Sequence, residues 1–70
     1  MTEEVLKTHF MKEYGHIYDR LKPSYQSIID MIITAAAKGK HNTDDINIIM
    51  YGIVQGFDLI RREHDAFEQP

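Results

Sequence analysis

The chain has 70 residues, no cysteine and a net charge of −3, from eight Lys and Arg against eleven Asp and Glu. A chain of this length forms one domain that buries only about 60% of the surface of its unfolded form. The lack of cysteine excludes disulfides and zinc–thiolate sites, which leaves oligomerisation as the usual way to stabilise so small a core. The acidic balance also argues against direct nucleic-acid binding, which is favoured by a basic excess.

Hydropathy gives no indication of a secretory or membrane-spanning segment. The chain begins with the acidic residues Glu3 and Glu4 and lacks the apolar core of a signal peptide. Its longest apolar stretch, 28–37, is interrupted by Asp30 and Thr34. That stretch is far shorter than the roughly 20 residues that span a bilayer. We therefore expect a cytoplasmic protein with no membrane partner, folded as a single helical domain over residues 1–70.

Apolar residues at steps of three and four predict a first helix over residues 3–21. They are Leu6, Phe10, Tyr14, Ile17 and Leu21. Thr2 is placed to cap the start of this helix, where Glu3 and Glu4 complement the helix dipole. Gly15 falls on the opposite side, which we expect to face solvent.

Pro23 ends the first helix and is tolerated in the first turn of a second one, which is predicted over residues 23–38. Apolar residues cover an arc of about 200° on this second helix, at 100° per residue. We therefore expect it to be the most buried helix of the chain. Asp30 and Thr34 are the residues in its interior that we expect to face water.

A third helix is predicted over residues 44–64. Gly39 is typical of the position just after a helix, and Thr43 is placed as the N-cap of the next one. Residues 66–70 are expected to form a disordered tail. Connections this short make neighbouring helices antiparallel, so the sequence predicts an all-α fold, either a three-helix up-down-up bundle or an extended helical hairpin.

The third helix carries apolar residues on two faces, whereas a helix at the surface of a monomer needs only one. The core face is made by Ile46, Ile49, Met50, Ile53, Phe57 and Ile60. The opposite face is made by Ile48, Tyr51, Gly52, Gln55 and Leu59. Gly52 and Gly56 add a spacing of small residues that allows another helix to approach closely. Full exposure of the second face would approach the largest apolar patch that a soluble monomer usually tolerates.

Three arrangements would account for the second face. The first and second helices could cover both faces of the third, the face could form a homodimer, or it could bind a different protein. The last two are compatible, because a dimer can present a composite groove. Asp58, Arg61 and Arg62 border the face, either as a simple solvated charge cluster or as a rim that influences partner choice and association rate.

Other chemistry has weaker support in the sequence. His9, Glu13 and His16 share one helical face and are suitable metal ligands, but a closed site would need a fourth ligand, such as His41 or His64. We therefore predict no metal and no cofactor, and keep metal binding as a minor alternative.

A segment over residues 34–54 has the spacing of a helix-turn-helix. Its second helix would present Asp44 and Asp45 to DNA, which opposes that role. Ser24 and Ser27 lie at a helix start, and the chain has no glycine-rich phosphate loop, so we predict no enzymatic activity.

These observations predict a small acidic module that binds protein through the second apolar face of the third helix. The predicted contact residues are Ile48, Tyr51, Gly52, Gln55, Leu59, Asp58, Arg61 and Arg62. Proteins of this kind often act as stoichiometric regulators or inhibitors of another protein, and a phage or mobile element is a plausible source. We also expect the chain to form a homodimer, and a purely structural homodimer is the alternative function.

Overall fold

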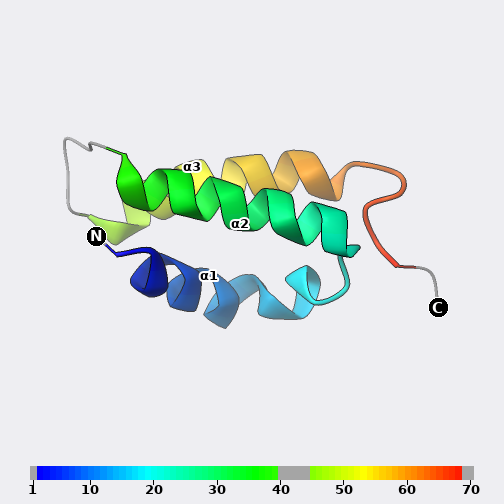
Figure 1. Ribbon diagram of the computed structural model, residues 1–70, viewed down its shortest axis with the longest axis horizontal. Coiled ribbons are helices and arrows are strands. Elements are labelled where there is room, and N and C mark those ends of the chain that lie inside the picture. The colour runs from blue at the N-terminus through cyan, green and yellow to red at the C-terminus, as the bar shows by residue number, and fades with distance from the viewer. Residues whose placement is uncertain (1, 40–44, 69–70) are drawn as a thin grey trace.

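The computed structural model describes residues 2–39 and 45–68 of the chain. Within these residues it has three α-helices of 16 residues each: α1 (Glu3–Tyr18), α2 (Pro23–Lys38) and α3 (Ile46–Arg61) (Figure 1). The predicted all-α fold is confirmed. Successive helices run in opposite directions, and α2 contacts both α1 and α3 more extensively than these two contact each other (Figure 1). No helix in the described part of the chain is long and apolar enough to cross a membrane.

Helix α1 begins as predicted and ends one turn early. The Thr2 hydroxyl accepts a hydrogen bond from the Val5 amide at 3.2 Å, which caps the start of the helix. The helix stops at Tyr18, before the predicted end at Leu21, because Leu21 leaves the helix to form an isolated antiparallel β-bridge with Phe67. Helix α2 has the predicted bounds, since Pro23 disfavours helical geometry at the residue before it.

Helix α3 is shorter than the predicted range of 44–64. Asp45 is its N-cap, and its carboxylate accepts a hydrogen bond from the Asn47 amide at 2.9 Å. The predicted cap Thr43 lies outside the described residues. At the other end the helix stops at Arg61, because the following residues turn back to place Ala66 against the connection between α1 and α2.

The core combines side chains from all three helices and the C-terminal segment. Its fully buried members are Leu6, Phe10, Leu21, Ile29, Ile33, Ile53, Phe57 and Ala66. Phe10 and Phe57 meet edge to face with ring centroids 5.1 Å apart, which joins α1 to α3. Gly15, expected to face solvent, is buried beneath Met11 of the same helix, whose Cε would lie 3.5 Å from an added Cβ.

The orientation of α2 differs from the prediction. Asp30 accepts hydrogen bonds from the Lys7 ammonium at 2.7 Å and the Tyr18 hydroxyl at 2.9 Å. Thr34 donates to the Glu3 carboxylate at 2.7 Å. The side of α2 that we expected to face water therefore packs against α1. Only two α2 residues are buried, compared with four in α3, so the prediction that α2 is the most buried helix is wrong.

The C-terminal segment also differs from the expected disordered tail over 66–70. Ala66 is completely buried, and its carbonyl accepts a hydrogen bond from the Lys22 amide at 2.9 Å. The Glu68 amide donates to the Arg20 carbonyl at 3.0 Å. The Arg20 guanidinium lies 5.3 Å from the centre of the Phe67 ring. Residues 66–68 are thus held against the α1–α2 connection, while residues 69 and 70 lie outside the described part of the chain.

Candidate functional site

The second apolar face of α3 lies on the surface of the molecule. Ile48, Tyr51 and Leu59 are 59%, 68% and 64% exposed. Gln55 is exposed as well, and a Cβ added at Gly52 would meet nothing within 4 Å. The arrangement in which α1 and α2 cover both faces of α3 is therefore not the one that this structure has.

Helix α2 extends this surface. Helix α3 approaches α2 closely at Gly56, because a Cβ added there would lie 3.1 Å from Ile32 Cδ1. On α2, helical periodicity places Ile28 beside Ile32 on the side away from α1, and Met31 on the outer face of the helix, opposite the core. They are 42% and 69% exposed. Helical periodicity places Ile48, Gly52 and Leu59 on the corresponding outer side of Gly56.

Ile32 of α2 and Gly56 of α3 are in contact, and the two helices are antiparallel. This contact fixes which residues of α2 and α3 lie side by side along the helix axes. Ile28 is four residues from Ile32, and Leu59 is three residues from Gly56 in the same direction, so these two side chains lie at the same end of the surface. We call the exposed outer side of these two helices the α2–α3 face. Its members are Ile28, Met31, Ile48, Tyr51, Gly52, Gln55 and Leu59.

Sequence reasoning missed the contribution of α2 to this face. The apolar arc of about 200° that predicted a buried α2 includes Ile28 and Met31. The signal that could have identified them is the pair Asp30 and Thr34. If Asp30 and Thr34 had been predicted to contact α1, the opposite side of α2 would have been predicted to be exposed.

The predicted charged rim is only partly assembled beside the face. Asp58 and Arg61 form an ion pair at 3.3 Å, with both side chains about half exposed. The Arg61 guanidinium stacks over Phe57 at 5.5 Å from the ring centre, so it leans toward the core side of α3. Asp58 and Arg62 line a shallow hollow together with Gln55 and Leu59. The structure therefore brings Asp58 and Arg62 to the edge of the α2–α3 face, and Arg61 joins these two residues in lining a neighbouring hollow.

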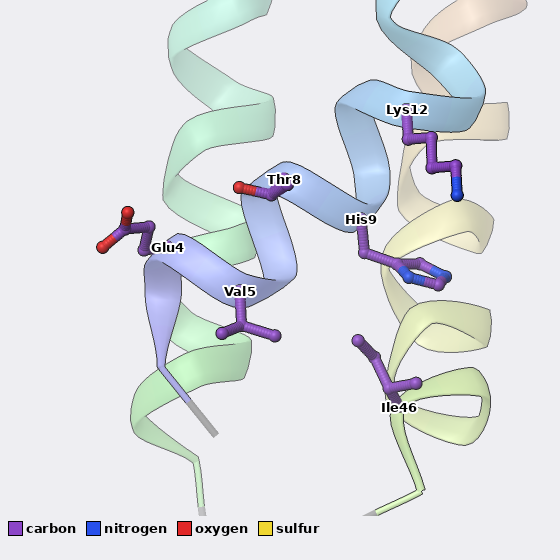
Figure 2. A pocket seen from close by; sticks show the side chains of 6 residues that line it. All are labelled: Glu4, Val5, Thr8, His9, Lys12 and Ile46. Carbon is purple, nitrogen blue, oxygen red and sulfur yellow. The ribbon is translucent and has the colours of Figure 1, made fainter.

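A second hollow lies between the first turns of α1 and the start of α3 (Figure 2). It has a volume of about 360 Å³ and is lined by Glu4, Val5, Thr8, His9, Lys12 and Ile46. His9 and Ile46 face one another across it, whereas Glu4 and Thr8 project to the other side of α1 (Figure 2). The hollow is open and mixed in character, and its polar groups do not converge on one point.

The histidines do not assemble into a metal-binding cluster in the described part of the chain. There the structure shows no group of three or more His, Cys, Asp or Glu side chains that could hold a metal ion. His9 and His16 therefore gain no third ligand among residues 2–39 and 45–68. His41 lies outside those residues.

The chain has no significant match among protein-family models, curated proteins or solved structures.

Proposed function

We propose that this protein is a small protein-binding module that regulates or inhibits a partner protein stoichiometrically. The observation that carries the proposal is the exposure of Ile48, Tyr51 and Leu59 on one face of α3, next to the exposed Ile28 and Met31 of α2. Taking about 150–200 Å² for each complete side chain, these five expose roughly 450–600 Å² of surface. Exposed apolar area of that size is near the largest patch that a typical soluble monomer carries, and such patches are often functional.

The composition of the face supports binding to protein. Tyr51 offers a large ring with a polar end, a combination enriched among the residues that dominate interface energies. Asp58 and Arg62 supply a polar edge, as the rim of an interface usually does. Burial of the apolar area releases roughly 25 cal/mol for each Å², which is the driving force for docking.

A regulatory role follows from size and surface. The hollows of the described residues are open and shallow, which does not favour enclosure of a small substrate. A chain of 70 residues with one apolar face can instead cover a functional surface of a larger protein, as inhibitors encoded by phages and mobile elements do. A cytoplasmic location suits such a role. The competing proposal is a purely structural homodimer that uses the same face.

Capture from a lysate of the source organism tests the proposal. Tagged wild-type protein is compared with Leu59→Asp, which places a charge at the edge of the face, and with Val5→Asp, which introduces the same residue at an exposed apolar position of α1. We expect a specific protein to be captured by the wild type and by Val5→Asp but lost with Leu59→Asp. Circular dichroism must show equal helix content for all three.

Undiminished capture by Leu59→Asp would contradict the proposal, because the partner would then dock elsewhere. Capture of no protein in near-stoichiometric amount by the wild type would favour the structural homodimer.

A further inference from the structure

The exposed side of α3 has the spacing of a coiled-coil seam. Six residues follow one another at alternating steps of three and four: Asp45, Ile48, Gly52, Gln55, Leu59 and Arg62. All six are exposed. A heptad spacing of this kind keeps one line of residues facing a neighbouring helix along its whole length. Because this line faces no other helix within the described residues, the seam is suited to a helix from another molecule.

The two ends of the seam carry opposite charges. Asp45 stands at the start of α3 and Arg62 directly after its end. Two parallel copies of the seam would bring Asp45 against Asp45 and Arg62 against Arg62, which is repulsive at both ends. Two antiparallel copies bring each acid against a base. The pattern of charge therefore favours an antiparallel pair of identical helices.

The interior of the seam fits the same antiparallel register. When Asp45 lies opposite Arg62 of a second copy, Ile48 lies opposite Leu59 and Gly52 lies opposite Gln55. The apolar pairs flank the centre, and the missing side chain at Gly52 leaves room for the longer Gln55. Charge, apolar contact and size are thus all satisfied by one twofold axis, which passes between Gly52 and Gln55.

We propose that the α2–α3 face binds a second copy of this chain, with the two α3 helices antiparallel in this register. This inference rests on the proposed function, because it assigns one occupant to the same face. Ile28 and Met31 of the neighbouring helix α2 are also exposed and would be available to widen the contact. Complete burial of all five exposed apolar side chains in both copies would remove at most roughly 900–1,200 Å² from solvent, which is near the lower limit for a specific interface. The dimer is therefore reversible, and a regulatory target competes with the second copy for the face.

Sedimentation velocity over a hundredfold dilution series tests whether a second copy of the chain binds the α2–α3 face. We expect the wild type and Val5→Asp to pass from dimer to monomer on dilution, and Leu59→Asp to remain a monomer throughout. A wild-type protein that is monomeric at every concentration would overturn the inference, as would a Leu59→Asp variant that still dimerises with wild-type affinity.

Disulfide cross-linking tests the register, and the absence of native cysteine makes it specific. In the antiparallel register, position 48 of one copy faces position 59 of the other. Position 48 of one copy and position 48 of the other lie roughly 16 Å apart along the helix axis, at 1.5 Å per residue, and the same holds for position 59. This separation is too large for a disulfide. We therefore expect Ile48→Cys and Leu59→Cys to form a covalent dimer on mild oxidation only when the two variants are mixed. Efficient cross-linking of either variant with itself, or none in the mixture, would overturn the register.

The two proposals fail in different ways. If the wild type is monomeric but Leu59→Asp loses the captured protein, the second copy is excluded as occupant and the regulatory function stands. If the dimer forms in the expected register but Leu59→Asp still captures the partner protein from the lysate, the dimer stands and the regulatory function on this face is excluded.

Discussion

At the scale of single residues, Asp30 marks the side of α2 that faces α1. Its carboxylate is bound by Lys7 and Tyr18 of α1. The hydrogen bond to Asp30 is the main reason that the pKa of Lys7 is raised, while burial is the main reason that the pKa of Tyr18 is raised. Neither effect can be read from sequence spacing, since Asp30 looks there like an ordinary solvent-facing residue. The side of α2 that does not contact α1 contributes to the α2–α3 face.

The raised pKa values predict loss of stability in alkali. A group whose pKa is raised by folding stabilises the fold below its unfolded value, here 10.0 for Tyr18 and 10.5 for Lys7, and loses that contribution as pH rises through the folded value. We expect this cluster to contribute a constant free energy of unfolding between pH 8 and about 9.5, falling above pH 10.

The variant Tyr18→Phe isolates one member of this cluster. Loss of the hydrogen bond to Asp30 should lower the free energy of unfolding by about 0.5–1.5 kcal/mol at pH 8. This deficit should shrink above pH 10, because phenylalanine has no phenol to ionise. Urea unfolding at dilute protein and a series of pH values measures both effects, with Tyr51→Phe, whose ring is exposed, as the control. A deficit that stays constant to pH 11 would contradict the assignment.

At the scale of the helices, the sequence predicts those helix ends that depend on residues nearby in the chain. The bounds of α2 follow from Pro23 and Gly39, and the start of α1 follows from Thr2, so these were predictable. The ends of α1 and α3 depend instead on contacts distant in the sequence. Leu21 lies outside the helix and forms a β-bridge with Phe67, and no short-range sequence pattern indicates that bridge.

Truncation of the C-terminal segment measures the value of this distant contact. A chain that ends at Asp65 loses the buried Ala66 and the two backbone hydrogen bonds that Lys22 and Glu68 donate. Compared with a chain that ends at Glu68, we expect its free energy of unfolding to fall by about 1–3 kcal/mol. Chemical denaturation of the two chains gives the difference. Equal stability would show that residues 66–68 contribute nothing, as the sequence-based expectation of disorder implies.

At the scale of the whole molecule, the candidate site was half predictable. The α3 residues Ile48, Tyr51 and Leu59 could be identified because their 3.6-residue periodicity sets them opposite the core stripe. The participation of Ile28 and Met31 required the rotation of α2, which depends on its polar contacts with α1. The rim illustrates the same limit, since Arg61 matches the spacing of a rim residue but stacks on Phe57.

The slender shape of the molecule links its stability to its assembly. With extents of 41 × 18 × 16 Å, it has a narrow core and a large surface for its volume. If two copies bind only in the folded state, mass action requires the melting temperature to rise with protein concentration. For a domain of this size we expect a rise of roughly 2–6 °C over a hundredfold increase, as association overtakes the dissociation constant. Scanning calorimetry or fluorescence melting at matched concentrations measures it.

The variant Leu59→Asp should melt at one temperature over the whole range, because its face can no longer bind a second copy. Val5→Asp should follow the wild type, which separates the effect of association from that of adding an acid to an exposed helix. A wild-type melting temperature that does not depend on concentration would show that folding gains nothing from a second copy. The narrow core would then be sufficient alone, and the exposed apolar area on α2 and α3 would be reserved for a different protein.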